Sequence, residues 1–284
     1  MLGIESVNFD ADERDVKGAN TEDAGLKILA NVAKASRRQI KVVERVAPGN
    51  VGEFDAICCT DSGIYFIEMK RLGGKFGEFS MLDRQIRLSA GRQEKVIPNP
   101  ALKFKHKVDR LIAEEFNTSE NWKVVKRLFS GHVPVHSILC FGPSTSFEEG
   151  IPVSEKNITI CTTRTLGKTL KDIHSEREQV FGVGSQMAAL VEFWPRWGIL
   201  TMTGKRGFFR CSISKIGQGR SDATVWGLTA LESDGARLKY TYGKDRKRTT
   251  AFDELVLLRA YHDGSERAIG IEPGTRFRWR IMGR

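Results

Sequence analysis

Three ionisable residues in two neighbouring strand-like segments have the types and spacing for metal-assisted hydrolysis. Asp55 lies in the apolar run 54–60, and Glu68 and Lys70 lie in the run 64–70. Carboxylate oxygens are the ligands that hard divalent cations such as Mg²⁺ prefer. A lysine beside such a cation can orient and help deprotonate a water that attacks a phosphodiester. The alternative is a surface salt bridge on a hairpin, because acids and lysines are common on strands.

The turn between the two runs decides how these side chains face each other. Asp61-Ser62-Gly63 is typical of a tight turn, so the two runs are expected to form a β-hairpin. If the first two turn residues form the loop, Asp55 lies opposite Glu68, and if the last two do, it lies opposite Lys70. Both registers put all three side chains on one face, because side chains alternate along a strand.

Five motifs surround this hairpin. In chain order they are Gly18-Ala19-Asn20-Thr21-Glu22, Gly52-Glu53-Phe54-Asp55, the run 63–70, Asn99-Pro100 and the apolar run 133–141. With this order and spacing, residues of about 18–175 resemble the nuclease-related domain (NERD) family of the PD-(D/E)XK, restriction-endonuclease-like superfamily. The resemblance covers a little over half of the chain. It implies an α/β fold with a restriction-endonuclease-like core, in which helices flank a mixed sheet.

The resemblance also implies roles for individual residues. Asp55 and Glu68 would bind Mg²⁺ or Mn²⁺, Lys70 would be the catalytic lysine, and Glu22 would be a helix-borne acid that reaches the same site. Glu53 would bind a second metal, orient Lys70 or lie at the rim of the site.

Two positions depart from the family pattern. Thr21 stands where the family usually has glycine, and Lys103 stands where the Asn-Pro segment usually continues to a glutamine. The loss of this amide changes the fine geometry that the family pattern implies, although a lysine at 103 can contact a phosphate.

Glu22 is also placed by its own surroundings. The spacing of Leu26, Leu29 and Val32 predicts a helix over 21–35, with Asn20 or Thr21 as its N-cap. Glu22 lies one turn before Leu26 and so can point to the same buried side. The alternative is that Glu22 only complements the positive end of the helix dipole.

A second amphipathic helix is predicted over 104–116, after strands expected at 39–46 and 78–88. Its apolar stripe leaves Lys103, Lys107 and Arg110 on another face. This basic edge is expected to face a backbone phosphate, with ordinary solvation as the alternative. Further along, the pattern predicts a central strand at 135–141, a strand at 158–161 and helices at 165–173 and 177–193.

Composition indicates a polyanionic partner. The net charge is +10 and the pI is about 9.4, which favours nucleic acid. Five cysteines in a chain of this length are expected to be buried and reduced. The sequence has no signal pattern and no membrane-spanning run, so we expect a cytoplasmic protein with no membrane partner.

The composition changes near residue 194, and short alternating runs follow. We therefore predict a domain at 1–193 and a small, basic, mostly-β domain at 194–284, either a barrel or a sandwich. Arg278 lies on a three-arginine strand face, and Arg246, Lys247 and Arg248 are expected in a loop flanked by tyrosines. Both features suit nucleic-acid binding, and an ordinary solvated surface is the alternative for each.

Two functions from different classes remain open on the sequence. The first is a metal-dependent nuclease acting on DNA, with RNA ranked below DNA as substrate. The second is a non-catalytic nucleic-acid-binding or assembly subunit on the same fold. For the nuclease, a regulatory or recruiting protein partner is expected, in DNA repair or defence against foreign DNA.

Overall fold

The computed structural model describes most of the 284 residues. The described residues are 13–36, 39–48, 51–77, 79–80, 83–90, 93–148, 150, 157–203, 209–218, 221–224, 228–242, 246–262 and 265–281. The chain forms two compact units. The N-terminal unit contains Val16–Glu44 and Phe54–Leu190, and the C-terminal unit contains Val191–Arg284 together with Arg45–Glu53. The switch after Leu190 lies close to the composition change near 194, while Arg45–Glu53 belongs to the C-terminal unit despite its early position.

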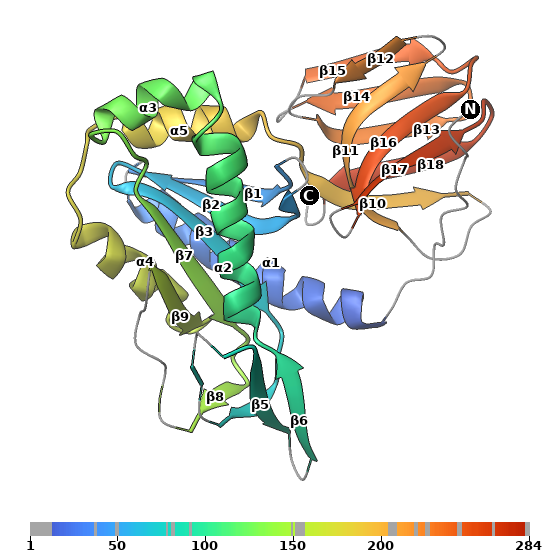
Figure 1. Cartoon of the computed structure of the whole chain (residues 1–284). Helices are drawn as coiled ribbons and strands as arrows, with labels where there is room; N and C mark the ends of the chain where they lie inside the picture. The colour runs from blue at the N-terminus through green and yellow to red at the C-terminus, as the bar shows by residue number, and fades with distance from the viewer. Residues whose placement is uncertain are drawn as a thin grey trace. The chain divides into compact units, whose positions relative to one another are not determined.

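The N-terminal unit is built on a mixed five-stranded sheet of order β1-β2-β3-β7-β9 (Figure 1). β2 and β3 are antiparallel, whereas β3, β7 and β9 are parallel neighbours. β3 and β7 are buried along most of their length, as expected for central strands. The bounds are Ile40–Val46 for β1, Phe54–Thr60 for β2, Gly63–Lys70 for β3, Val135–Phe141 for β7 and Ile158–Thr162 for β9.

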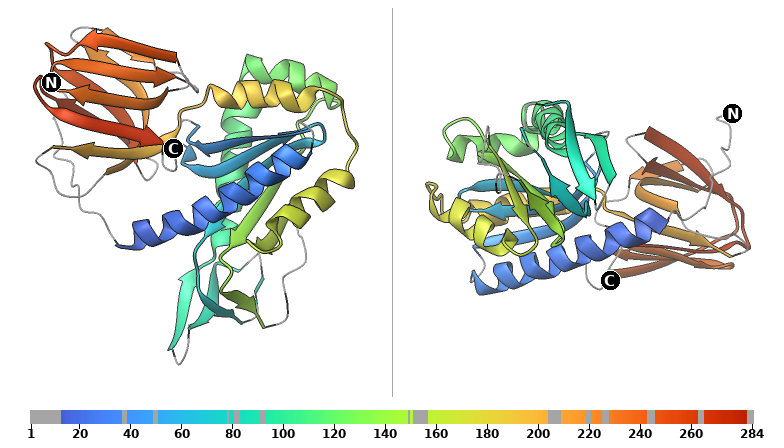
Figure 2. Two further views of the ribbon diagram at one scale, coloured as in Figure 1. Left: turned by 180° about the vertical axis from the view of Figure 1, so that it is seen from behind. Right: turned by 90° about the horizontal axis from the view of Figure 1, so that it is seen from below.

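Helices cover both faces of this sheet (Figure 2). On one face, α1 (Glu13–Ala35) and α4 (Leu166–Ser175) pack with β2, β3 and β7 around Leu29, Tyr65 and Leu170. On the other face, Phe54 and Phe66 contact Phe104 and Phe116, which belong to α2 (Pro100–Leu111) and the following π-helical turn (Ile112–Phe116). The N-terminal unit is therefore a mixed α/β layer structure, as predicted. Its remaining helices are a 3₁₀ turn at Glu120–Trp122, α3 (Lys123–Leu128) and α5 (Val183–Glu192).

Several predicted boundaries are wrong for local reasons. Helix α1 extends back to Glu13, so Asn20 and Thr21 lie inside it and do not cap it. Residues 13–20 contain no proline, and single glycine or asparagine residues only weaken a helix. The helix predicted at 177–193 begins only at Val183, because Gly182 has a φ of 82°, which a right-handed helix does not accommodate.

The hairpin expected at 78–88 forms later in the chain. β5 (Gln85–Ala90) and β6 (Gln93–Pro98) pair with each other in a four-stranded sheet of order β6-β5-β4-β8. β4 (Gly74–Phe76) and β8 (Thr145–Phe147) complete this sheet. Phe76 stacks on Phe147 with ring centroids 5.2 Å apart, and this aromatic packing anchors the short strands.

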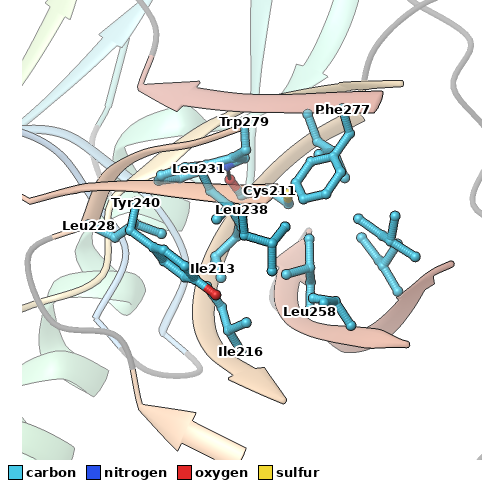
Figure 3. Packing of buried hydrophobic residues seen from close by; sticks show 14 of the residues in the cluster. Cys211, Ile213, Ile216, Leu228, Leu231, Leu238, Tyr240, Leu258, Phe277 and Trp279 are labelled. Atoms are coloured by element: carbon cyan, nitrogen blue, oxygen red, sulfur yellow. Dashed lines mark hydrogen bonds between the residues drawn. The ribbon is translucent and has the colours of Figure 1, made fainter. Parts of the chain in front are cut away.

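The C-terminal unit is a nine-stranded antiparallel sheet that curls around one hydrophobic core (Figure 3). Eight strands follow the order β15-β14-β13-β18-β10-β11-β16-β17, and β12 pairs with β11. Trp279 is fully buried, and its indole N–H donates to the Cys211 carbonyl over 3.1 Å. The bounds are Trp197–Met202 (β10), Phe209–Gln218 (β11), Ser221–Thr224 (β12), Leu228–Asp234 (β13), Arg237–Tyr242 (β14), Arg246–Ala251 (β15), Val256–His262 (β16), Ser265–Ile271 (β17) and Arg276–Ile281 (β18).

One expectation for this unit is corrected. Arg246, Lys247 and Arg248 lie in strand β15, at one edge of the sheet, and not in a loop. β15 pairs with β14 along its whole length, and charged side chains are common on edge strands, where they limit pairing with other chains. The mostly-β character of the unit is as predicted.

The five cysteines are buried and free, as expected. No helix in the described part of the chain is long and apolar enough to cross a membrane.

Candidate active site

The hairpin register that the sequence left open is settled by the pairing of β2 with β3. Thr60 pairs with Gly63, so Asp61 and Ser62 form the two-residue loop. The ladder ends at the pair Ala56 and Ile67, and Asp55 and Glu68 are the next residues along the two strands. At this step the Asp55 carboxylate takes the place of a ladder carbonyl, since its Oδ2 accepts the backbone N–H of Met69 over 2.6 Å.

Glu68 is the centre of a compact ion-pair network. Its Oε1 lies 2.6 Å from the Lys70 ammonium, and its Oε2 lies 2.7 Å from the Lys107 ammonium. The side chains of Glu68 and Lys107 are 12% and 17% exposed, so this pair is largely shielded from solvent, whereas Lys70 is 40% exposed. In such an environment charge-assisted hydrogen bonds are stronger than at an open surface.

Helix α2 carries Lys107 into the site, and Asn99 fixes where this helix begins. Asn99 is the N-cap, and its Oδ1 accepts the N–H of Ala101 over 2.9 Å. Pro100 follows as the first helical residue, where its missing N–H costs no hydrogen bond. Two turns on, the Lys107 ammonium lies 4.3 Å from the centroid of the Phe54 ring, a cation–π contact that holds it over β2.

Glu22 comes to the same carboxylates from the opposite layer, on α1. It is 7% exposed, and its charge acts on both Asp55 and Lys70. Since α1 begins at Glu13, Glu22 lies more than two turns into the helix, beyond the reach of the helix-terminal dipole. The alternative that Glu22 only complements the helix terminus is therefore wrong.

Burial and nearby charges shift the protonation of Asp55, Glu68 and Lys70. Burial raises the pKa of Asp55 to about 7, and the charges of Glu68 and Glu22 add to this rise, against the opposing effects of Lys70 and the Met69 N–H. Burial also acts to raise the pKa of Glu68, but the charges and hydrogen bonds of Lys107 and Lys70 outweigh it and hold this pKa at about 2. The Glu68 charge raises the pKa of Lys70 above its usual value, so this ammonium is protonated in the resting site.

The donor set fits a hard divalent cation. Mg²⁺ is commonly held by one or two carboxylates together with water and substrate phosphate. Asp55 and Glu68 provide two, and a cation bound beside Asp55 would favour the ionised form that burial and the charges of Glu68 and Glu22 disfavour. The described residues contain no group of three or more His, Cys, Asp or Glu side chains in a metal-binding arrangement. A bound cation would therefore rely on this pair and on its other ligands from solvent or substrate.

The other predicted site residues lie in different places. Lys103 is exposed on α2, one turn before Lys107, and no described contact joins it to the carboxylates. Glu53 precedes β2 in the C-terminal unit, and its charge acts on Cys211 of that unit. Arg278 is exposed on β18 of the C-terminal unit. Arg246, Lys247 and Arg248 are exposed on β15 of the same unit.

Lys107 is the site residue whose role the sequence did not reveal. It was expected to face nucleic acid, but its ammonium binds Glu68. The signal was its position between Phe104 and Val108, which are both buried on the sheet side of α2. A lysine at the border of an apolar stripe can extend its stem over that stripe and place its charge on a buried carboxylate.

Comparison with known proteins finds no matching family model, no matching curated protein and no matching solved structure. The resemblance to the NERD family therefore rests on the motif residues alone.

Proposed function

We propose that this protein is a metal-dependent nuclease that hydrolyses DNA phosphodiester bonds, with a restriction-endonuclease-like core of the PD-(D/E)XK type. The observation that carries the proposal is the gathering of Glu22, Asp55, Glu68 and Lys70 from one helix and two strands, where the charges of Glu22 and Glu68 act on the pKa of both Asp55 and Lys70. Strongly shifted pKa values with specific charged partners are characteristic of functional sites.

Each residue has a distinct role in this proposal. Asp55 and Glu68 hold Mg²⁺ or Mn²⁺, which when bound neutralises phosphate charge and lowers the pKa of water. Lys70 orients the attacking water and helps to remove its proton. For this, Lys70 must be released from Glu68, whose charge raises its pKa while the two are paired. Glu22 adds negative charge beside Asp55 and Lys70. The basic C-terminal unit holds the substrate.

Cleavage of plasmid and single-stranded DNA in Mg²⁺ and in Mn²⁺ tests the proposal. Glu68→Gln, Asp55→Asn and Lys70→Met should each lower the cleavage rate by at least about a hundredfold, the scale of a general acid–base contribution. Lys75→Met is the matched control, because Lys75 forms an exposed pair with Glu148 at 3.1 Å. If the wild-type protein binds DNA but cuts neither substrate in either metal, the proposal that it is an enzyme is wrong.

The ion-pair network favours a second candidate, a non-catalytic nucleic-acid-binding or assembly subunit. Both oxygens of Glu68 are engaged by lysines, so this carboxylate is satisfied without a cation. For such a subunit, Glu68→Gln should reduce thermal stability and leave DNA binding and all metal responses unchanged.

The proposed substrate follows from charge rather than from the site. DNA is the proposed substrate because of the basic composition, and RNA is the less favoured one. We also propose a protein partner that restrains or recruits the nuclease, in DNA repair or defence.

A further inference from the structure

The outer face of the sheet in the C-terminal unit carries an unusual row of positive charge. Alternation along the strands puts Leu231, Leu238 and Trp279 in the core, so their sequence neighbours point outward. Four adjacent strands, β15, β14, β13 and β18, form this face. Its cations are all exposed, and we call the set the basic face: Arg237, Lys239, Lys247, Arg276, Arg278 and Arg280.

The register aligns these cations across strands. Lys239 pairs with Glu232, which pairs in turn with Arg278, so the three form one row. Lys247 and Arg280 lie at the two ends of the next row. Neighbouring strands are about 4.8 Å apart, and residues two apart on a strand are about 6.7 Å apart. The charges therefore form a regular grid.

Two carboxylates on β13 reduce this charge only in part. Glu232 contacts the guanidinium groups of both Arg278 and Arg280, and Asp234 lies 3.2 Å from the Lys239 ammonium. Six cations against two carboxylates leave four positive charges in excess. This excess favours a polyanion as the partner.

The face also indicates how the polyanion is bound. The described aromatic side chains of these four strands, Tyr240, Tyr242, Phe277 and Trp279, belong to or pack against the inner core. The basic face thus offers arginines and lysines without a described aromatic ring on which an unpaired base could stack. This combination suits the phosphates of duplex DNA, which are contacted without base readout.

We propose that the basic face is a binding surface for the backbone of duplex DNA. In choosing DNA as the polyanion, the inference rests on the proposed function. The basic residues predicted from sequence to bind nucleic acid in this unit thus fall into two groups. Lys247 and Arg278 lie on the basic face. Arg246 and Arg248 share the opposite side of the sheet with Tyr242 and Tyr240.

Binding of a labelled random-sequence duplex to the full chain in EDTA tests the inference separately from cleavage. Lys247→Gln/Arg278→Gln should weaken binding about tenfold and lower the salt slope of log K by about 1.8, the value for two lost phosphate contacts. Arg246→Gln/Arg248→Gln removes the same charge from the other side of the sheet. This control should change binding less than about threefold and leave the slope unchanged.

Glu232→Gln provides a gain-of-binding variant that does not depend on a loss of folding. It releases Arg278 and Arg280 from their shared carboxylate, so it should tighten duplex binding and steepen the salt slope. Equal losses in the two double variants, or no loss in the first, overturn the inference. If the protein binds anionic lipid vesicles and does not bind the duplex, the inference is also overturned. If the binding changes are as expected but neither the wild type nor any variant cleaves DNA, the inference about the basic face is supported and the nuclease proposal fails.

Discussion

The Lys107 ammonium lies 2.7 Å from Oε2 of Glu68, whose other oxygen is bound by Lys70. A metal that binds Glu68 must therefore compete with two positive charges. The charge of Lys70 belongs to the proposed chemistry. The charge of Lys107 comes from α2, in another layer of the fold, so in our proposal the strength of metal binding depends on the position of this helix.

Replacing Lys107 should strengthen metal binding. In Lys107→Met the pKa of Glu68 should rise, and its Oε2 becomes available to a cation. We expect Mn²⁺ affinity, measured by calorimetry, to increase about tenfold, or about 1.4 kcal/mol. Lys103→Met removes an exposed lysine one turn away and should leave the affinity unchanged. Equal affinities of wild type and Lys107→Met would contradict competition for Glu68.

Asp55→Asn should stabilise the metal-free protein at alkaline pH. Burial raises the pKa of Asp55 to about 7, so the folded state keeps a proton between pH 4 and 7 that the unfolded state has lost. Stability therefore falls as pH rises through this window. At pH 8 in EDTA, urea unfolding should give Asp55→Asn an advantage on the order of 2–4 kcal/mol.

The exposed residue Asp109 provides the control for this experiment, and Asp109→Asn should change stability by less than about 0.5 kcal/mol. Added Mg²⁺ should stabilise wild type more than Asp55→Asn. If Asp55→Asn is less stable than the wild type at pH 8, burial of the charged Asp55 carboxylate does not destabilise the folded protein.

His136 should make the protein sensitive to acid. Burial, together with the charge of Arg177, lowers its pKa to about 4. The unfolded state binds a proton below about pH 6.5 and the folded state does not, so stability is lost as pH falls from about 6.5 towards 4. Between pH 7 and 5 the free energy of unfolding should therefore fall by about 2 kcal/mol.

His136→Gln should remove most of this loss when urea unfolding is compared at the two pH values. Glutamine can still reach Thr159 and Arg177, the partners of the two imidazole nitrogens. His132→Gln changes an exposed histidine and should retain the wild-type pH dependence. The same pH dependence in His136→Gln and wild type would assign the acid sensitivity to other groups.

We expect the start of α2 to depend on the polar side chain of Asn99. Its Oδ1 caps Ala101, and its Nδ2 donates to the carbonyls of Ser80 and Asp83 over 2.9 and 2.7 Å. Asn99→Ala should lower the free energy of unfolding by about 2–4 kcal/mol, because the buried Asn99 side chain loses three hydrogen bonds.

Asn99→Ser restores a capping oxygen without the two donors, so it should recover about 1 kcal/mol of this loss. Both variants are measured by urea unfolding. If serine and alanine destabilise equally, the cap does not contribute and the anchoring to Ser80 and Asp83 accounts for the whole effect.

Local sequence determined the pieces of the site that depend on short-range rules. The hairpin of Asp55, Glu68 and Lys70 was predictable because a tight turn separates two apolar runs, and side chains alternate along a strand. The apolar stripe predicted a helix over 104–116, but the helix begins earlier, at Pro100, where Asn99 caps it. The burial of all five cysteines and the β-rich C-terminal segment followed from composition and alternation.

The tertiary structure decided what these pieces contact. Nothing in the sequence near Lys107 identifies Glu68 as its partner, because the packing of α2 against β2 and β3 brings them together across 39 positions. Likewise, the row of Lys239, Glu232 and Arg278 exists only through the strand order of the sheet. Local patterns set each strand and helix, whereas the meeting of distant charges depends on how hydrophobic faces pack.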